Sequence, residues 1–427
     1  IGRDLRPSSA RLSQNVADAA AGMGLRVADC GEIPTPALAL AAMAAGAPSI
    51  MVTGSHIPAD RNGLKFYTAT GEITKADEAA ILAAYHEGPP GPPTTPEDAS
   101  AARSAYARRY TEAYGSALRG LRIGVYQHSS VARDLLAEVL GALGARVTPL
   151  GRSDSFVPVD TEAVSAATRQ MLADWAAGGT LDAIVSTDGD ADRPLVADAA
   201  GRVIPGDVIG TLAAAALGAE TIVTPVSSNT LIEASGRFGA TTRTRIGSPF
   251  VIAGMEAEMA RPGARVAGFE ANGGFLLGFT ARGPAGPLAP LMTRDAFLPI
   301  IATLAEAART GQSLSALVAT LPARHTASDR LAAVPTDWSQ GLVAGLSDDP
   351  AKRRAFFTGR NERAIDRTDG LRVTFSDDTI LHLRPSGNAP ELRCYAEAGT
   401  AAVAEALVRD TLARIARLRD APEGETA

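Results

Sequence analysis

Short apolar runs alternate with longer alanine- and leucine-rich stretches along most of the chain. The apolar runs have the length of buried strands, and the longer stretches are typical of helices. Strands are predicted at Leu25–Ala28, Ser49–Thr53, Leu121–Tyr126, Leu181–Thr187, Glu220–Val226 and Ala264–Glu270. Helices are predicted at Pro36–Ala45, Lys75–Tyr85, Ala101–Ala117, Val131–Leu143 and from about Asn229. This alternation indicates parallel α/β units.

Two stretches depart from the alternation. Residues 86–100, "HEGPPGPPTTPEDAS", are expected to form an irregular surface loop, because proline lacks a backbone donor and fixes φ. Later, the runs Leu371–Phe375 and Thr379–Leu383 flank a short polar segment and predict an antiparallel hairpin. An amphipathic helix at Ala401–Leu418 and a disordered tail from Asp420 are expected to follow. The last region therefore differs from the units before it.

Three predicted strands end in a polar loop that contains glycine, after Thr53, Thr187 and Phe269. The repetition is weak, since the three loops share no clear residue identity. In open α/β sheets, ligands bind beyond the carboxyl ends of the strands. The sequence therefore allows the three loops to face one cleft.

Composition narrows the class of protein. The 427 residues suggest about three domains on length alone, and a net charge of −6 argues against nucleic acid as the main partner. Cys30 and Cys394 give neither a disulfide framework nor a metal-binding spacing, which fits a reducing cytoplasm. No apolar run has the length of a membrane span, so no membrane partner is expected. Because the chain starts at Ile1, we expect leading residues to be missing.

The segment "DGDADRP" places the carboxylates of Asp188, Asp190 and Asp192 within five residues. Like charges this close repel, and a cation relieves the repulsion. Carboxylate oxygens suit Mg²⁺, Mn²⁺ or Ca²⁺. An EF-hand is excluded, since its sixth position is Arg193 here; a solvated acidic turn is the alternative to a metal site. Arg193 has the chemistry to bind an anion beside the metal.

Two further segments offer polar groups at predicted strand ends. "LRPSGNAPELR" brings Arg384, Ser386, Gly387 and Asn388 into one short turn, where they are donors for an anion; the alternative is an ordinary turn. "GFEANGG" offers Glu270 and Asn272, whose carboxylate and amide suit sugar hydroxyls, and "TRIGSPF" adds Arg245. Either segment taken alone is weak evidence for a site.

Ser55 lies beside His56 in "TGSHIP", which suggests a hydrolase nucleophile. The segment lacks the G-x-S-x-G elbow, and no oxyanion hole or third orienting group is visible. A metal site, an anion site and a sugar-sized polar loop together favour phosphoryl transfer, with Ser55 as the phosphoryl carrier. An ordinary polar turn residue is the alternative.

These motifs together resemble those of the α-D-phosphohexomutase family. Thr53–Pro58 is similar to the phosphoserine loop T-[AG]-S-H-N-P, and Asp188–Arg193 matches D-G-D-x-D-R in full. Phe269–Gly273 approximates G-E-x-S-G, and Arg384–Arg393 approximates R-P-S-G-T-E-P-x-x-R. Ile1–Ser9 resembles an early G-R-D-x-R segment. The motifs occur in family order across nearly the whole chain.

The resemblance implies three related mixed α/β domains and a C-terminal α+β domain around one central cleft. We expect a phosphoserine-bearing domain at residues 1–117 and a metal-binding domain at 118–218. A sugar-recognising domain at 219–325 and a phosphate-binding domain at 326–427 are expected to follow.

The activity implied is the interconversion of hexose 6-phosphate and hexose 1-phosphate through phospho-Ser55 and a hexose 1,6-bisphosphate, which also acts as activator. One Mg²⁺ per active site is expected at Ser55, Asp188, Asp190 and Asp192. Catalytic roles fall on Ser55, His56, Lys65 and Arg193, with His56 and Lys65 as acid/base candidates. The substrate-binding positions implied are Glu270, Asn272, Arg245, Arg384, Ser386, Gly387, Asn388 and Arg393.

The sequence departs from the family pattern at Ile57, Asn272, Asn388 and Ala389. The combination of G-S-H-I-P and E-A-N-G-G is similar to the phosphomannomutase-like subgroup, which favours mannose. Phosphoglucomutase, phosphoglucosamine mutase, a non-catalytic phosphosugar-binding protein and a phosphatase acting through Asp188 are the alternatives. The expected partners are small hexose phosphates, and the protein is expected to be a monomer or homodimer.

Overall fold

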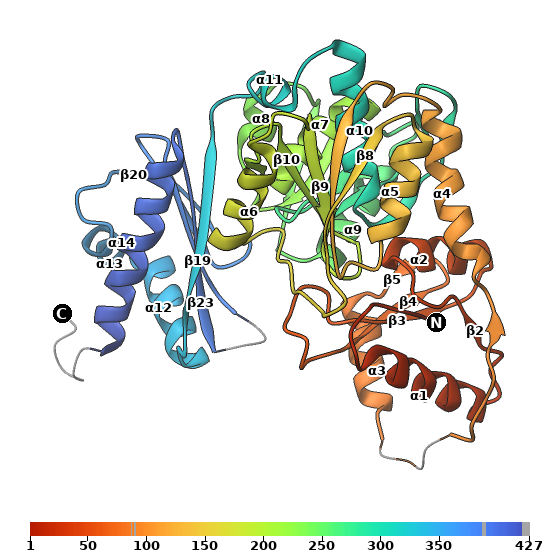
Figure 1. The fold of residues 1–427 in the computed structure, drawn as a ribbon. Coiled ribbons are helices and arrows are strands. Elements are labelled where there is room, and N and C mark those ends of the chain that lie inside the picture. The colour runs from red at the N-terminus through yellow and green to blue at the C-terminus, as the bar shows by residue number, and fades with distance from the viewer. Residues whose placement is uncertain (87, 89–90, 387–389, 421–427) are drawn as a thin grey trace. The chain divides into compact units, whose positions relative to one another are not determined.

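The computed structural model describes residues 1–86, 88, 91–386 and 390–420 (Figure 1). The chain forms two compact units. Unit 1 comprises residues 1–224, 237–242 and 247–320, and unit 2 comprises residues 225–236, 243–246 and 321–427.

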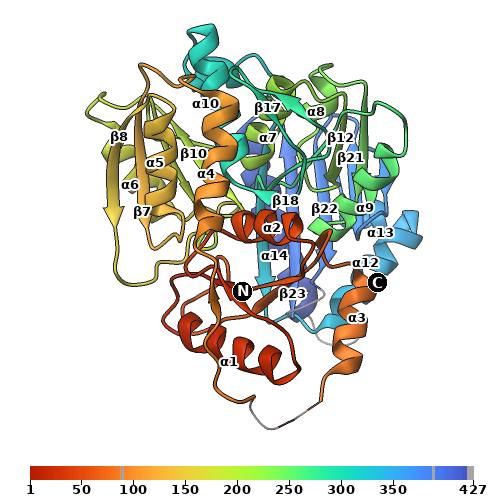
Figure 2. The ribbon, with the colours of Figure 1, turned by 90° about the vertical axis from the view of Figure 1, so that its right-hand side faces the viewer.

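Three sheets share one arrangement and lie in unit 1, apart from the ends of two strands of the third sheet (Figures 1 and 2). Their strand orders are β1-β3-β4-β5, β11-β10-β9-β7-β8 and β13-β12-β14-β15-β18. The first sheet consists of β1 (Gly2–Arg3), β3 (Ser49–Val52), β4 (Leu64–Thr68) and β5 (Gly71–Glu72). The second consists of β7 (Arg122–His128), β8 (Arg146–Arg152), β9 (Ala183–Thr187), β10 (Pro194–Asp198) and β11 (Val203–Ile204). The third consists of β12 (Thr221–Pro225), β13 (Ala240–Thr244), β14 (Val266–Phe269), β15 (Phe275–Leu277) and β18 (Leu291–Asp295).

Each sheet contains a parallel strand pair whose second strand turns back into an antiparallel neighbour. These turning strands are β3, β9 and β14, which pair with β4, β10 and β15. The loops between them hold residues 53–63, 188–193 and 270–274, which we name the serine loop, the aspartate loop and the glutamate loop. The three loops therefore occupy equivalent places in three related sheets, and the prediction of three related α/β domains is confirmed.

Helices cover these sheets, and the most apolar ones lie in the interior. The helices of unit 1 are α1 (Ser9–Gly22), α2 (Thr35–Ala44), α3 (Lys75–Ala84), α4 (Ala101–Tyr114), α5 (Arg133–Ala142), α6 (Ala166–Ala176), α7 (Gly206–Leu217), α9 (Ser248–Met259), α10 (Phe297–Thr310) and α11 (Leu314–Val318). Ten of the twelve residues of α7 and ten of the fourteen residues of α10 are buried, and the two helices pack against each other. A helix that is apolar over most of its surface, as α7 is, is stable only where neighbours cover it.

Unit 2 contains an antiparallel sheet of order β19-β23-β22-β21-β20. Its strands are β19 (His325–Ala332), β20 (Glu362–Asp366), β21 (Leu371–Phe375), β22 (Ile380–Pro385) and β23 (Glu391–Ala398). Its helices are α8 (Leu231–Ala234), α12 (Thr336–Asp348), α13 (Pro350–Phe356) and α14 (Ala401–Asp420). Buried side chains of the sheet, such as Leu371, Phe375 and Leu383, form one core with Leu407 and Ile415 of α14. The predicted hairpin and the distinct C-terminal α+β domain are confirmed.

Most predicted elements are present with slightly shifted ends, and three expectations were wrong. The strand expected at Leu25–Ala28 is only β2 (Ala28–Asp29). Residues 86–100 are not wholly irregular, because β6 (Glu97–Asp98) pairs in parallel with β2 where the prolines end. The helix expected from Asn229 is the single turn α8, which ends before Gly236 at φ 63°. The tail after Asp420 lies outside the described residues.

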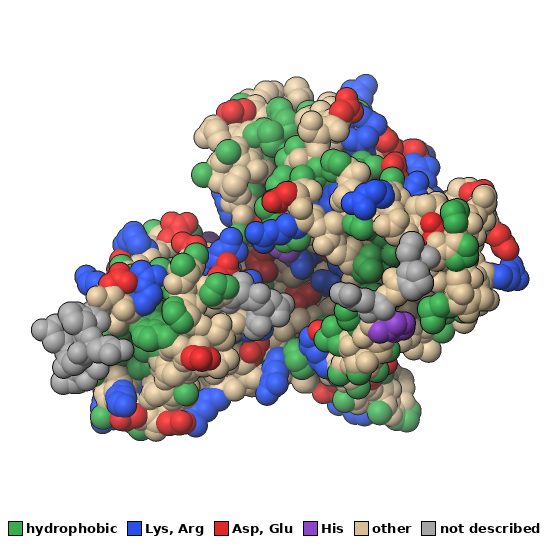
Figure 3. All heavy atoms as spheres, turned by 90° about the horizontal axis from the view of Figure 1, so that it is seen from below, with side chains coloured by type: hydrophobic (Ala, Val, Ile, Leu, Met, Phe, Trp, Pro, Cys, Tyr) green, Lys and Arg blue, Asp and Glu red, His purple; other side chains and the backbone are tan. Residues whose placement is uncertain are grey.

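The surface is charged and mixed in sign. On the face drawn in Figure 3, Lys and Arg side chains are interspersed with Asp and Glu side chains. None of the helices in the described ranges combines the length and the apolar character that crossing a bilayer requires.

Candidate active site

Ser55 lies buried at the start of the serine loop with its hydroxyl against the aspartate loop. Its Oγ donates to Oδ2 of Asp188 at 2.6 Å and lies 3.4 Å from Nδ1 of His56. Its backbone has φ 51°, a left-handed conformation that costs energy for a residue other than glycine. The strain aims the hydroxyl at the aspartate loop, so residues 133 positions apart in the chain meet.

Arg6 fixes the serine loop from beneath. The Nη atoms of its guanidinium donate to the carbonyls of Ser55, Ile57, Pro58 and Arg61 at 2.6–3.0 Å. Its Nε donates to Asp4 at 3.1 Å, so all five N–H donors have an acceptor. The sequence placed Arg6 in a recognised motif but gave it no role.

The three carboxylates of the aspartate loop lie close enough to share one ion. Asp188, Asp190 and Asp192 are fully buried, and one oxygen from each lies within 4.8 Å of the others. Oδ1 of Asp190 and Oδ1 of Asp192 are buried and have no hydrogen-bond partner in the described part of the chain. Unpartnered buried oxygens of this kind suit a hard divalent cation.

Besides Arg193 of the same loop, two cations from other segments balance the charge of these aspartates. Nζ of Lys65 lies 2.6 Å from both Asp190 and Asp192. Nη2 of Arg294 lies 3.0 Å from Asp192, whereas Nε of Arg193 is 3.8 Å from it. Both closer cations come from other strands, so local sequence spacing did not reveal them.

The side chains around the three aspartates carry more negative than positive charge. Five carboxylates, those of the three aspartates, Glu72 and Glu270, stand against Lys65, Arg193 and Arg294. With every one of these groups ionised, two negative charges remain, and one divalent cation would balance them. Burial, together with the neighbouring Asp190 and Asp192, raises the pKa of Asp188 well above its usual range. The residues present therefore fit a Mg²⁺ site.

His56 and Lys65 have opposite electrostatic environments. Burial, and then the positive charge of Arg193, lower the pKa of His56, whose Nδ1 is 3.0 Å from Nη1 of that arginine. Burial also opposes the charge of Lys65, but Asp190 and Asp192 outweigh it and raise the pKa of the lysine. Near neutral pH, His56 is therefore a neutral ring and Lys65 is protonated.

The glutamate loop carries Glu270 and Asn272, both buried. Oδ1 of Asn272 accepts from the Gly274 amide at 3.0 Å, so this side chain also shapes its own loop. Oε2 of Glu270 is 3.8 Å from Nη1 of Arg294 and has no hydrogen-bond partner among the described residues. A carboxylate oxygen left free in this way is available to a ligand hydroxyl.

Arg245 and Arg384 approach one turn within unit 2. Nε of Arg384 is 2.8 Å from Asp369, and Nε of Arg245 donates to the carbonyl of Thr368 at 3.2 Å. Arg393 is 4.0 Å from Glu391, and Ser386 is buried. Gly387 and Asn388 lie outside the described residues.

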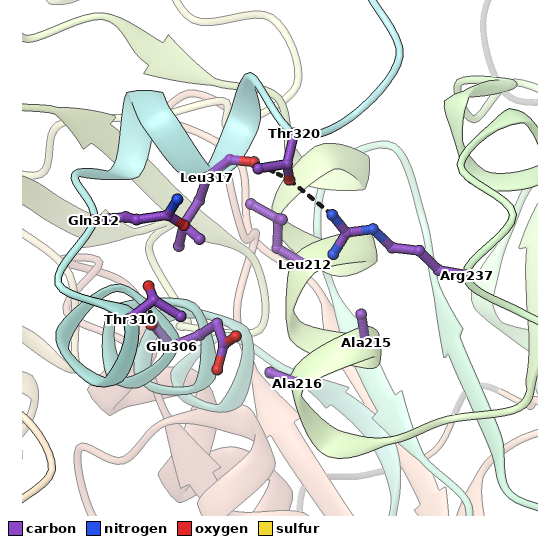
Figure 4. Close-up of a pocket in the computed structure, with 9 residues that line it drawn as sticks. All are labelled: Leu212, Ala215, Ala216, Arg237, Glu306, Thr310, Gln312, Leu317 and Thr320. Atoms are coloured by element: carbon purple, nitrogen blue, oxygen red, sulfur yellow. Dashed lines mark hydrogen bonds between the residues drawn. The ribbon is translucent and has the colours of Figure 1, made fainter.

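A separate pocket in unit 1 contains none of the predicted site residues. It has a volume of about 200 Å³ and lies between α7, α10 and α11 (Figure 4). Within it Arg237 donates to Oγ1 of Thr320 at 2.7 Å. Small-molecule sites usually occupy about 300–1,000 Å³, so this pocket is small for a sugar phosphate.

Sequence comparison extends the match over nearly the whole chain. Profiles of the phosphoglucomutase/phosphomannomutase family match in order: α/β/α domain I at residues 1–90, domain II at 104–201, domain III at 205–325 and the C-terminal domain at 328–414. A phosphomannomutase of Sinorhizobium fredii is 48% identical over 422 residues, covering 97% of this chain and 89% of that protein. A phosphomannomutase of Salmonella muenchen is 46% identical over 420 residues (96% and 86%). A phosphoglucosamine mutase of Frankia alni is 31% identical over 434 residues (97% and 86%).

Solved structures share the fold. A phosphoglucomutase/phosphomannomutase family protein of Burkholderia thailandensis has a TM-score of 0.75 at 22% identity, covering 98% of this chain and 88% of that one. An N-acetylphosphoglucosamine mutase of Aspergillus fumigatus, solved with GlcNAc-6P and magnesium, has a TM-score of 0.57 at 17% identity (90% and 92%). With all four domains matched and near-complete relatives close to half identical, the chain belongs to the phosphoglucomutase/phosphomannomutase family, within the α-D-phosphohexomutase superfamily.

Proposed function

We propose that this protein interconverts mannose 6-phosphate and mannose 1-phosphate, with Ser55 as phosphoryl carrier and a hexose 1,6-bisphosphate as intermediate and activator. The observation that carries the proposal is the 2.6 Å contact between Ser55 Oγ and Asp188 within the buried carboxylate cluster. A phosphoryl group carried on Ser55 Oγ would lie against the aspartates that would hold the metal.

Asp188, Asp190, Asp192 and the phosphate of Ser55 would hold one Mg²⁺. When bound, the ion supplies positive charge that offsets the charge developing on the transferred phosphoryl group. Thr35 donates to Asp190 at 2.6 Å and keeps that carboxylate in place from α2.

The chain's own groups account for transfer and proton movement. As the bond between phosphorus and Ser55 Oγ breaks, a new bond forms between phosphorus and a sugar hydroxyl, whose proton must leave. His56, a neutral ring 3.4 Å from Ser55 Oγ, is the candidate to accept that proton, and Lys65, a cation, is the candidate to donate a proton to the departing Ser55 Oγ. The bisphosphate then turns around, and its other phosphoryl group is returned to Ser55 Oγ.

Two loops are assigned to substrate binding. Glu270 and Asn272 would bind sugar hydroxyls. Arg384, with Ser386, Gly387, Asn388 and Arg393, would bind the phosphate that is not being transferred, and Arg245 would assist. Asp369 holds the Arg384 guanidinium at 2.8 Å and so limits its freedom before substrate arrives.

Mannose is proposed because the relatives at 48% and 46% identity are phosphomannomutases, whereas the Frankia alni relative at 31% is a phosphoglucosamine mutase. The test compares kcat/KM for mannose 1-phosphate, glucose 1-phosphate and glucosamine 1-phosphate with a trace of the matching bisphosphate. We expect the highest value for mannose, and a higher value for glucosamine 1-phosphate would refute the assignment.

The carrier role has its own test. Intact-mass analysis after incubation with bisphosphate is expected to show one added phosphate, absent from Ser55→Ala, and this variant is expected to lose nearly all turnover. Ser155→Ala, at an exposed serine of unit 1, is the matched control and should behave as the parent does. Full turnover of Ser55→Ala would exclude Ser55 as carrier.

A further inference from the structure

Arg294 joins three carboxylates from three different sheets. It lies in β18, and its three guanidinium nitrogens each face a different acidic residue. Nη2 is 3.0 Å from Asp192 of the aspartate loop, Nε is 3.5 Å from Glu72 of β5, and Nη1 is 3.8 Å from Glu270 of the glutamate loop. Its side chain is only 12% exposed. One side chain thus contacts each of the three related domains.

The position of Arg294 is fixed by its neighbours. The next residue, Asp295, accepts hydrogen bonds from Tyr106, Tyr110 and the Phe297 amide, which anchors the end of β18. On the other side, a Cβ added at Gly274 would lie 3.0 Å from Cγ and Cδ of Arg294. The glutamate loop therefore has glycine at the point where the arginine stem passes.

Glu270 depends on this arginine. Among the described residues, Arg294 supplies the only ion pair of the Glu270 carboxylate. A buried carboxylate without a cation is strongly unfavourable, so Arg294 determines where the charged Glu270 rests. A lysine has a single nitrogen at that end and does not face three carboxylates at once.

We propose that Arg294 is a positioning residue that sets the Glu270 carboxylate relative to the aspartate loop, and that it thereby determines which hexose phosphate is preferred. The proposal rests on the proposed function, because it assigns Glu270 to sugar hydroxyls. Epimeric hexoses differ in the direction of one hydroxyl, so discrimination between them requires an acceptor at a defined place. A displacement of about 1 Å at such a site costs about a hundredfold in rate.

The test compares Arg294→Lys and Arg294→Met with the parent enzyme. Arg294→Lys keeps the charge but loses the three-sided contact. We expect the ratio of kcat/KM for mannose 1-phosphate over glucose 1-phosphate to fall by about tenfold or more, while the Mg²⁺ affinity measured by calorimetry without substrate changes little. Arg294→Met makes the region more negative, so Mg²⁺ should bind more tightly while discrimination is lost. Arg353→Lys, at a buried arginine that pairs with Glu362 at 2.6 Å in unit 2, is the control and should change neither quantity.

A purely structural role gives a different pattern, in which every sugar slows equally and Mg²⁺ binding weakens. That pattern, or an unchanged sugar ratio in Arg294→Lys, would overturn the proposal. If both Arg294 variants fail to fold, Gly274→Ala decides, because the new methyl group must shift the arginine stem without removing its charge. It should lower the same ratio to a smaller extent, and an unchanged ratio would overturn the proposal. Failure of the proposed function is distinct, since the parent itself would then convert no hexose phosphate.

Discussion

Replacing Arg6 by lysine should loosen the serine loop while keeping the positive charge beneath it. The guanidinium uses five donors, four of them on carbonyls of this loop, whereas a lysine ammonium has three. At least two acceptors therefore lose their partner. Hydrogen bonds to charged groups contribute about 1.5–3 kcal/mol each, which gives an upper bound of about 3–6 kcal/mol. Three of the four carbonyl bonds are only partly buried, so water replaces part of the loss and we expect about 3 kcal/mol.

Hydrogen exchange is the assay that reports this change directly. The Ile57 and Arg61 amides donate within the serine loop, to Gly54 and Pro58, and exchange only when it opens. A cost of about 3 kcal/mol raises the open population roughly a hundredfold, so protection should fall by that factor, and kcat/KM by about tenfold or more.

The matched control is Arg3→Lys in the neighbouring β1. Among the residues that the structure describes, Arg3 pairs only with Asp29, at 3.0 Å and with 23% exposure, so one ammonium can replace its contact. Unchanged loop protection in Arg6→Lys, or an equal loss in Arg3→Lys, would refute the reasoning.

Three further predictions concern the charged or titratable side chains of Asp188, His128 and Arg384. Asp188→Asn keeps an acceptor for the Asp192 and Arg193 amides but removes one of two excess negative charges. It should raise the Tm of the protein in the presence of a chelator and abolish the rise in Tm that Mg²⁺ causes. A rise in Tm on adding Mg²⁺ equal to that of the parent would contradict the metal assignment. Burial lowers the pKa of His128 to about 4, against about 6.5 when unfolded. The folded state thus resists protonation, so the contribution of His128 to the unfolding free energy is fully present above pH 6.5 and falls by about 3 kcal/mol as the pH drops toward 4. Denaturation curves of His128→Gln should show a shallower fall of the unfolding free energy with pH, and a fall parallel to that of the parent would exclude His128 as its cause. Arg384→Ala should lower kcat/KM about ten- to a hundredfold, as expected for a lost charged hydrogen bond, and equally for 1-phosphate and 6-phosphate substrates; Arg363→Ala, at an exposed arginine paired with Asp378, should not, and a loss in only one direction would remove Arg384 from a shared phosphate site.

The parts of the site that were predictable are those written in consecutive residues. The spacing of Asp188, Asp190 and Asp192 predicts a metal site, and the three residues follow a buried strand as expected. Ser55 and Glu270 were found in the same way, because each begins a loop at the end of an apolar strand. The repetition of strand and polar loop was a weak sign of similar units, and the expectation of three related domains came from the family resemblance.

Arg294, Glu72 and Arg6 were missed because their roles arise from contacts between distant segments. Arg294 lies 102 positions from Asp192, and nothing around it resembles a motif of the site. One signal was available. Like Asp188 and Glu270, Arg294 is a charged residue near the end of a strand that contributes to the core, and here it shortly precedes the largely buried helix α10. Reading every such strand end, and not only those with several polar residues, would have included it.

The three loops lie at equivalent places in their sheets but differ in length and in the functional groups that they carry. The loops contain eleven, six and five residues between the paired strand residues Val52 and Leu64, Thr187 and Pro194, and Phe269 and Phe275. Both ends of each loop are tied by ladder hydrogen bonds, so residues added or removed between them need not slip the register of the strands. The same connection between a parallel strand and its antiparallel neighbour therefore tolerates loops of three different lengths. Replacing the five-residue glutamate loop by that of a relative with another sugar preference would therefore test its proposed role in sugar recognition while the serine and aspartate loops stay unchanged.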